Sequence, residues 1–211
     1  MLNGATLCLV PPDIFWDAAA LRALIETQRV NVALLPPAAL ALLAPEELPN
    51  CQTIISGGES CRPDLAARWA RGRKFFNAYG PTEATVAVSW YRVNETDGAA
   101  NIPIGRPIAN TQLYILDARM QPVPIGVPGE LYVGGVGLAR GYLNRPDLTA
   151  EKFITVGSQQ STVNSPLFSD HSSLRLYKTG DRARYRADGN IEFLGRLDHQ
   201  VKLRGFRIEL G

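Results

Sequence analysis

The stretch Phe76–Glu83, which reads FNAYGPTE, ends an apolar run and turns sharply at its Gly-Pro pair. It then offers a hydroxyl at Thr82 and a carboxylate at Glu83. An aromatic ring, an amide, a hydroxyl and an acid on one short loop can hold a planar base, a phosphate and a divalent cation together. The same residues also fit a plain turn followed by a solvated acid. The choice between a ligand-binding loop and a plain turn therefore depends on the neighbouring sequence.

Strand and helix patterns alternate along residues 1–95 and lead into this loop. We predict strands at Thr6–Val10, Val30–Leu35, Thr53–Ser56 and Lys74–Ala78, and helices at Phe15–Thr27 (with Asp13 as N-cap), Pro37–Leu43 and Arg62–Trp69. This rhythm indicates a parallel sheet. Ligands of such sheets bind at the carboxyl ends of the strands, where Gly57–Gly58 and Tyr79–Glu83 both fall.

From residue 96 onward the pattern changes to short strands separated by glycine and proline turns. We predict strands at Thr111–Asp117, Glu130–Val133, Arg182–Tyr185 and Ile191–Leu194, with a hairpin turn at Asp188-Gly189-Asn190. The segment Gly157–Ser173 is rich in Ser, Gln, Asn and Thr, which is typical of a mobile surface loop. The second half therefore reads as a small β-rich barrel or sandwich.

The composition indicates an ordinary globular protein. Of its 211 residues, 45% are hydrophobic and 20% are charged, and the net charge of +2 arises from well-mixed acids and bases. We therefore expect no nucleic acid partner. No run is long enough to span a membrane, and the three cysteines have neither metal-ligand nor redox-pair spacing, so we expect a cytoplasmic location with reduced thiols.

Three further islands carry groups suited to ligand binding. In Ile55–Glu59, two glycines after a strand allow a ligand close to the backbone, although a tight turn explains them equally well. Glycine-rich Gly129–Pro146 reads mostly as structural scaffolding. In the last island, Asp181 is suited to accept hydrogen bonds from vicinal hydroxyls, and Arg196 to pair with a phosphate or carboxylate. Solvated charges at a hairpin end are the alternative.

Taken in order, these islands resemble the motifs of adenylation domains of nonribosomal peptide synthetases, which are adenylate-forming enzymes. The matching segments are NAYGPTE, GELYVGGVGLARGYLNRPDLTAEKF, LYKTGD and GRLDHQVKLRGFRIELG. The resemblance implies an α/β fold in three parts. These are an α/β subdomain at residues 1–95, a β-rich barrel at 96–197, and a hinge at 198–211 leading to a C-terminal domain.

The resemblance also implies the chemistry. An amino acid carboxylate attacks the α-phosphate of ATP, giving an aminoacyl-adenylate and pyrophosphate, and the aminoacyl group passes to the phosphopantetheine thiol of a carrier-protein domain. Thr82 matches a hydroxyl that contacts the α-phosphate, Glu83 the Mg²⁺ ligand, and Asp198 the hinge about which the C-terminal domain swings. The nucleotide-binding candidates are Gly58, Glu59, Asn77, Ala78, Tyr79, Gly80, Asp181, Phe193 and Arg196.

The amino acid pocket follows by the same alignment. Its matched positions are all apolar or small: Leu34, Ile55, Gly57, Ala78, Val86 and Ala87. We therefore expect a hydrophobic amino acid substrate.

The family's Lys-containing phosphate loop should lie before Met1, and its C-terminal catalytic lysine beyond Gly211. We therefore expect a fragment that is not active alone. An acyl- or aryl-CoA ligase fragment and an inactive nucleotide-binding remnant are the alternatives.

Overall fold

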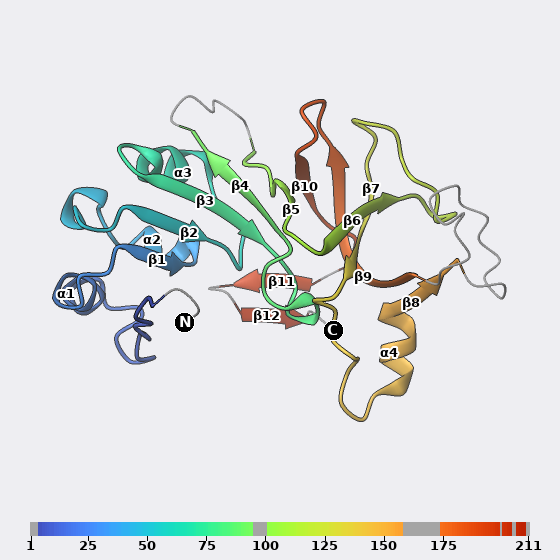
Figure 1. Cartoon of the computed structure of the whole chain (residues 1–211), viewed down its shortest axis with the longest axis horizontal. Coiled ribbons are helices and arrows are strands. Elements are labelled where there is room, and N and C mark those ends of the chain that lie inside the picture. The colour runs from blue at the N-terminus through green and yellow to red at the C-terminus, as the bar shows by residue number, and fades with distance from the viewer. Residues whose placement is uncertain (1–3, 95–100, 158–173, 199, 204–205, 210–211) are drawn as a thin grey trace. The chain divides into compact units, whose positions relative to one another are not determined.

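The computed structural model describes residues 4–94, 101–157, 174–198, 200–203 and 206–209. The chain divides into two compact units (Figure 1). Unit 1 comprises Met1–Asn77, Arg92–Ile102 and Lys202–Phe206, and unit 2 comprises Ala78–Tyr91, Pro103–Val201 and Arg207–Gly211. The predicted α/β class is confirmed, because unit 1 combines parallel strands with helices and unit 2 is dominated by antiparallel strands. The predicted boundaries after residues 95 and 197 stay a prediction.

Unit 1 contains the parallel part of the fold. Its elements are α1 (Ala18–Thr27), β1 (Val32–Leu35), α2 (Pro37–Leu40), a 3-10 turn (Pro45–Glu47), β2 (Thr53–Ser56), α3 (Pro63–Ala70) and β3 (Lys74–Tyr79), whose last two residues belong to unit 2. The helices α2 and α3 both begin with a proline, whose fixed φ suits a first turn and whose missing N–H is not needed there. Both β1 with β2 and β2 with β3 pair in parallel.

One face of these three strands is buried and the other is more open. Ala33, Ile54 and Phe75 are 7%, 0% and 0% exposed, whereas Leu34, between two buried neighbours on β1, is 64% exposed. Side chains alternate between the two faces of a strand, so this pattern assigns every second residue to the core. Trp69 of α3 is also fully buried, and its indole N–H donates to the Leu40 carbonyl of α2.

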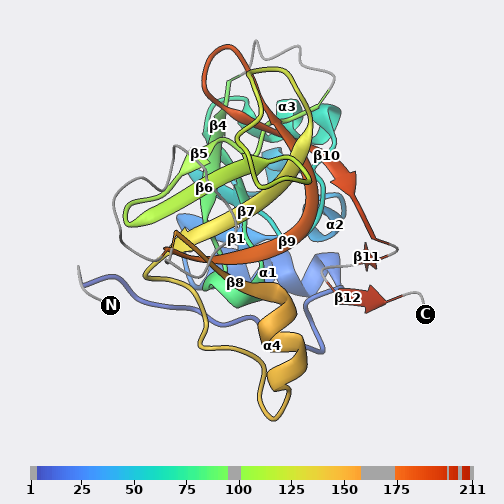
Figure 2. The same cartoon turned by 90° about the vertical axis from the view of Figure 1, so that its right-hand side faces the viewer.

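Unit 2 is built on an antiparallel sheet. The chain runs through the 3-10 turn η2 (Thr82–Ala84), β4 (Ser89–Val93, whose last two residues belong to unit 1), β5 (Arg106–Pro107), β6 (Thr111–Leu116), β7 (Gly129–Gly135), α4 (Pro146–Lys152), β8 (Phe153–Val156), β9 (Leu174–Tyr185) and β10 (Ile191–Arg196). The strand order is β10-β9-β7-β6, and β8 pairs with β9. Figure 2 shows β6, β7 and β9 side by side. The β-rich character is confirmed, while closure into a barrel stays a prediction. Strands β11 (Gln200–Leu203) and β12 (Phe206–Glu209) follow.

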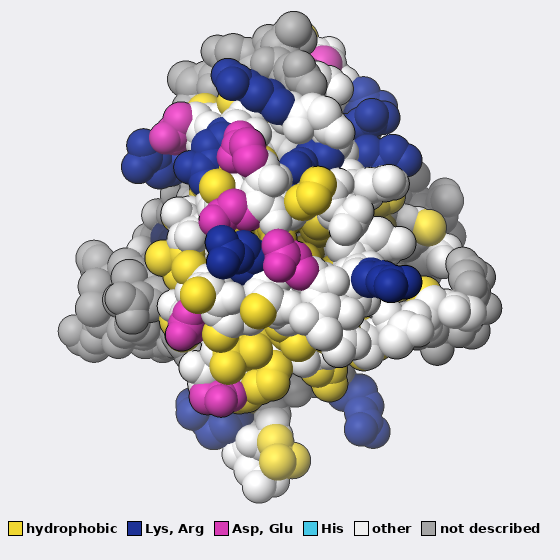
Figure 3. All heavy atoms as spheres, turned by 90° about the vertical axis from the view of Figure 1, so that its left-hand side faces the viewer, with side chains coloured by type: hydrophobic (Ala, Val, Ile, Leu, Met, Phe, Trp, Pro, Cys, Tyr) yellow, Lys and Arg dark blue, Asp and Glu magenta, His cyan; other side chains and the backbone are white. Residues whose placement is uncertain are grey.

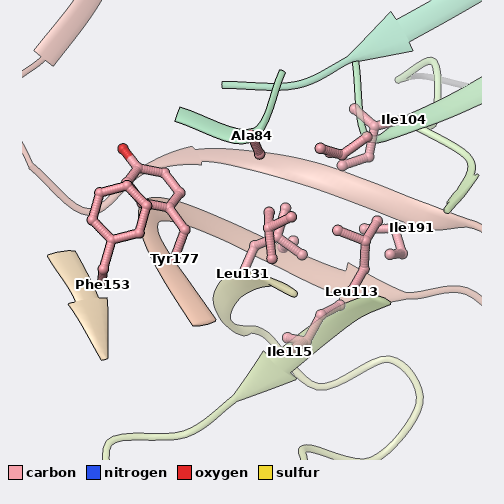
Figure 4. Close-up of a cluster of buried hydrophobic side chains, with 11 residues drawn as sticks. Ala84, Ile104, Leu113, Ile115, Leu131, Phe153, Tyr177 and Ile191 are labelled. Atoms are coloured by element: carbon pink, nitrogen blue, oxygen red, sulfur yellow. The ribbon is translucent and has the colours of Figure 1, made fainter. Parts of the chain in front are cut away.

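The core of unit 2 lies against this sheet (Figure 4). Leu131 and Ile191 are fully buried, and Ile115 is 1% exposed. Ala84 of η2 belongs to the same cluster. The turn that follows Tyr79 is therefore held by the core that also supports β9 and β10.

Several sequence predictions are wrong in detail. No strand forms at residues 6–10 within the described chain, and Leu7 and Leu9 are 63% and 75% exposed. An isolated strand is not stable, because its backbone groups need a partner. Helix α1 begins at Ala18, because the Asp17 carboxylate, not Asp13, accepts hydrogen bonds from the first N–H groups.

Other differences concern length. The helix predicted at residues 37–43 ends at Leu40. Strand β9 extends well before the predicted Arg182–Tyr185, and α4 was not predicted. Residues 158–173 of the predicted surface loop lie outside the described residues.

The surface carries mixed charge. On the face in Figure 3, basic and acidic side chains lie beside one another, with apolar side chains gathered below them. Unit 1 contributes exposed ion pairs such as Arg62 with Asp64 at 2.8 Å, which add little stability. Within the described part of the chain, no helix is both long enough and apolar enough to cross a bilayer.

Candidate nucleotide-binding site

The Gly80–Ala87 loop follows β3 and is held tightly closed. Val88 donates its backbone N–H to the Tyr79 carbonyl at 2.8 Å, which joins the two ends of the loop. A Cβ on Gly80 would lie 2.4 Å from the Val86 carbonyl oxygen, so only glycine permits this approach. The φ angle of Val86 is +72°, an unfavourable conformation for a β-branched residue. Such strain is typical of functional loops.

Glu83 is the buried acid of this loop. It is 7% exposed, while the neighbouring Thr82 is exposed. Its Oε1 accepts a hydrogen bond from the Tyr142 hydroxyl at 2.6 Å, and its backbone carbonyl accepts one from Ala139 at 2.8 Å. Sequence reasoning missed Tyr142, because no local pattern in GLARGY indicates a partner 59 residues away.

A second acid, Asp181 on β9, gathers polar partners around it. Asp181 is 4% exposed and accepts hydrogen bonds from the Tyr79 hydroxyl and from Nη1 of Arg196, the latter at 2.9 Å. Arg196 also donates to the Thr179 carbonyl at 2.9 Å and to the Asp198 carboxylate at 2.8 Å. Three of the predicted site residues, Tyr79, Asp181 and Arg196, are thus in direct contact.

Phe193 completes what we call the Asp181 cluster (Tyr79, Asp181, Phe193 and Arg196). Its ring centroid lies 6.4 Å from that of Tyr79, within the range of aromatic contact. A β-bulge between Phe193 and Gly195 sets the register, so that Phe193 lies opposite Ala183 and Arg196 opposite Asp181. The predicted residues of β9 and β10 therefore meet because of this bulge.

The environment shifts two titrating groups of the cluster. Burial and the charge of Asp181 raise the pKa of Tyr79 well above its ordinary value, so the hydroxyl stays protonated and can donate. Burial acts to lower the pKa of Arg196, but its hydrogen bonds to Asp198 and the charge of Asp181 outweigh that effect and raise it. The guanidinium therefore stays charged.

Further predicted residues lie in unit 1. Leu34 on β1 is opposite Ile55 on β2, and both are on the more open face of the sheet. The Glu59 carboxylate accepts a hydrogen bond from the Ala38 N–H at 2.9 Å, at the start of α2. Asn77 is 6% exposed. The remaining positions are Gly57 and Gly58 in unit 1, with Ala78, Val86 and Ala87 in unit 2. The ligand roles of all these residues stay predictions.

Comparison with known proteins identifies the family. The model of the AMP-binding enzyme family matches residues 1–143. The chain belongs to the AMP-binding enzyme family. One of the linear gramicidin synthase proteins of Brevibacillus parabrevis is 50% identical over 211 residues, which is 100% of this chain and 4% of that protein. This AMP-binding chain is thus similar to a small part of a peptide synthetase.

Solved structures agree with this assignment. NpsA-ThdA from Klebsiella oxytoca, an artificially fused adenylation and carrier (PCP) di-domain, matches with a TM-score of 0.80 and 30% identity, over 96% of this chain and 36% of that one. The Vibrio cholerae adenylation domain AlmE, in complex with glycyl-adenosine-5′-phosphate, matches with a TM-score of 0.78 and 30% identity, over 95% and 37%. The predicted resemblance of this AMP-binding chain to adenylation domains is confirmed.

Proposed function

We propose that this chain is part of an adenylation domain that activates an amino acid with ATP and loads it onto a carrier-protein phosphopantetheine. The observation that most supports the proposal is the Asp181 cluster, which places a carboxylate, two aromatic rings and a guanidinium in one part of unit 2. A nucleotide presents complementary groups, namely vicinal hydroxyls, a planar base and phosphates.

Each residue of the cluster has a chemically suitable role. A carboxylate has about four acceptor sites, so Asp181 can accept from ribose hydroxyls while it keeps its bonds to Tyr79 and Arg196. The rings of Tyr79 and Phe193 are suited to contact the base. Arg196, which stays charged, is suited to a phosphate. Asp198, exposed and bonded to Arg196, is the proposed hinge residue.

Glu83 is the proposed ligand of a magnesium ion. Within the described residues, no group of three or more His, Cys, Asp or Glu side chains lies together, so the described side chains supply no cage built from protein alone. Magnesium is usually held by one or two carboxylates together with substrate phosphates and water, and the buried Glu83 carboxylate fits that pattern. When bound, the ion would neutralise phosphate charge. We assign the exposed Thr82 hydroxyl to the α-phosphate.

The proposed substrate is a hydrophobic amino acid. Leu34 and Ile55 face one another across β1 and β2, and both are apolar. The other positions that match the pocket of adenylation domains are Gly57, Ala78, Val86 and Ala87, and all of them are small or apolar. A charged substrate side chain would find no counter-ion among these residues, and burying an unpaired charge is costly.

Two measurements test the proposal. Calorimetric titration of the 211-residue chain with AMP should show binding that Asp181→Asn weakens, while Asp188→Asn, in the exposed hairpin turn, leaves it unchanged. Absence of AMP binding would contradict the nucleotide site.

The reaction is tested after the chain replaces the matching segment of a complete adenylation domain. Pyrophosphate exchange should then depend on hydrophobic amino acids. Exchange driven by Asp or Lys would refute the proposed pocket, and exchange driven by fatty or aryl acids would indicate a CoA-ligase type of substrate. Amino-acid-dependent pyrophosphate exchange by the 211-residue chain alone would rule out the alternative that the chain is an inactive nucleotide-binding remnant.

A further inference from the structure

We propose that Tyr142 is a positioning residue that orients the Glu83 carboxylate for a divalent cation. This inference rests on the proposed function, because it assigns Glu83 to the metal. The segment Gly137–Tyr142 reads as scaffolding from its sequence, yet it meets the Gly80–Ala87 loop at three hydrogen bonds. Tyr142 donates to Glu83 Oε1 at 2.6 Å, Ala139 donates to the Glu83 carbonyl at 2.8 Å, and the Thr85 hydroxyl donates to the Gly137 carbonyl at 2.6 Å.

The Tyr142 hydroxyl is itself supported from behind. It lies 3.4 Å from the Tyr177 hydroxyl. A tyrosine has a single O–H proton, and that of Tyr142 is donated to Glu83, so Tyr177 is the donor in this second bond. Tyr177 is 2% exposed. Two hydroxyls in series, that of Tyr177 and that of Tyr142, thus lead to one carboxylate oxygen of Glu83.

The ring of Tyr142 has little freedom to turn away. Its centroid lies 5.8 Å from that of Phe153 in an edge-on arrangement, and Phe153 is 7% exposed. The backbone N–H of Tyr142 donates to the Thr149 hydroxyl at 2.9 Å. The preceding Gly141 has a φ of +151°, and a Cβ there would lie 2.5 Å from the Thr149 side chain.

Arg175 on β9 fixes the rest of this segment. Its guanidinium donates to the carbonyls of Ala139 and Arg140 at 2.7 and 2.8 Å. The same guanidinium lies over the Phe153 ring, 4.4 Å from its centroid. The segment that carries Tyr142 is therefore attached to the sheet, and through Tyr142 the sheet determines where Glu83 points.

Such a device has a measurable effect on metal affinity. Hydrogen-bond partners of ligating side chains typically change metal affinity by about 10–100-fold when they are removed. Tyr142 does not itself contact the ion, so Tyr142→Phe should weaken the metal without abolishing the nucleotide site. Tyr185→Phe is the matched control, because the Tyr185 hydroxyl also donates one hydrogen bond in unit 2, to the Leu113 carbonyl at 2.8 Å.

The test measures Mn²⁺ uptake by the 211-residue chain in the presence of ATP, followed by the electron paramagnetic resonance signal of free Mn²⁺. Mn²⁺ stands in for Mg²⁺ because both prefer oxygen ligands. We expect Tyr142→Phe to weaken Mn²⁺ by roughly tenfold or more. Tyr185→Phe should leave Mn²⁺ affinity unchanged, although it too removes a hydroxyl that donates a hydrogen bond in unit 2. In a Glu83→Gln background, Tyr142→Phe should have no further effect, because the two residues act as one unit.

The outcomes distinguish a failure of the proposed nucleotide site from a failure of the positioning role of Tyr142. If the wild-type chain binds neither AMP nor ATP, the nucleotide site and the positioning role both fail. If it binds the nucleotide and takes up Mn²⁺, but Tyr142→Phe matches Tyr185→Phe in Mn²⁺ affinity, only the positioning role is overturned. If Mn²⁺ uptake is present and unaffected by Glu83→Gln, Glu83 is not the metal ligand, and the role of Tyr142 fails with it.

Discussion

Replacing Asp181 by asparagine should measurably destabilise unit 2, although the shape of the side chain hardly changes. The carboxylate accepts hydrogen bonds from the Tyr79 hydroxyl and from the Arg196 guanidinium, and it is 4% exposed. Asparagine is neutral and has a single acceptor oxygen, which can still accept from Arg196, while its NH2 group replaces the oxygen that accepts from Tyr79 and can only donate to that hydroxyl. Both interactions therefore lose their charge assistance. The free energy of unfolding should therefore decrease.

The size of the decrease follows from these contacts. Hydrogen bonds to charged groups contribute about 1.5–3 kcal/mol and neutral ones about 0.5–1.5 kcal/mol, so the two bonds together lose about 2 kcal/mol. Arg196 keeps the Asp198 carboxylate and the Thr179 carbonyl as partners. The larger cost of an orphaned buried charge, about 3–5 kcal/mol, is therefore not expected. For a chain of this length, Tm should fall by about 4–8 °C.

Thermal unfolding followed by circular dichroism measures this change. The control is Asp188→Asn, because Asp188 is exposed and asparagine can still accept the Asn190 N–H in the hairpin turn. A double-variant cycle with Tyr79→Phe should give a coupling of about 0.5–3 kcal/mol, since the two residues share one hydrogen bond. An Asp181→Asn protein as stable as the control, with no coupling to Tyr79, would refute the reasoning.

Three further perturbations address the loop, the buried tyrosines and the core. Gly80→Ala should cost about 1–3 kcal/mol in urea unfolding, because its Cβ overlaps the Val86 carbonyl, whereas Gly137→Ala, with its nearest atom at 3.4 Å, should change little. Burial raises the pKa of Tyr177, so the stability that this residue contributes is fully present below pH 10 and should fall as the pH rises above it, by about 1.4 kcal/mol per pH unit. Burial raises the pKa of Tyr79 and Tyr132 as well, so Tyr177→Phe should remove only its own share of the slope, and a slope that is the same in both proteins would contradict this assignment. Leu131→Ala, in the core of Figure 4, should cost about 2–5 kcal/mol by the same urea assay, and a loss well below that range would show that the site is not tightly packed.

Local chemistry could be predicted from the sequence. Strand β2 occupies Thr53–Ser56, as its apolar run predicts. The Asp188-Gly189-Asn190 turn joins β9 to β10, and Gly189 has the positive φ of +78° that such turns need. These features depend on neighbouring residues alone, so the sequence pattern contains them.

Partners distant in the chain could not be predicted in the same way. The bond between Glu83 and Tyr142 depends on how a loop and a glycine-rich segment pack, and neither segment alone indicates it. The apolar run Thr6–Val10 has the composition of a strand, but a strand also needs a neighbour with which to exchange backbone hydrogen bonds. The residue pattern of a segment indicates what the segment can form, while the presence of a partner decides what it does form.

The β-bulge in β10 has a consequence for how this chain can change. Phe193 and Arg196 lie an odd number of positions apart, and such an interval sends two side chains to opposite faces of a regular strand. The unpaired residue, Leu194, brings both back to the face that they share with Ala183 and Asp181. Inserting one residue here would move Arg196 out of register with Asp181 while every side chain of the cluster stayed the same. In related sequences, an insertion or deletion of one residue at this point should therefore disrupt the pairing with the aspartate as severely as replacement of the arginine itself.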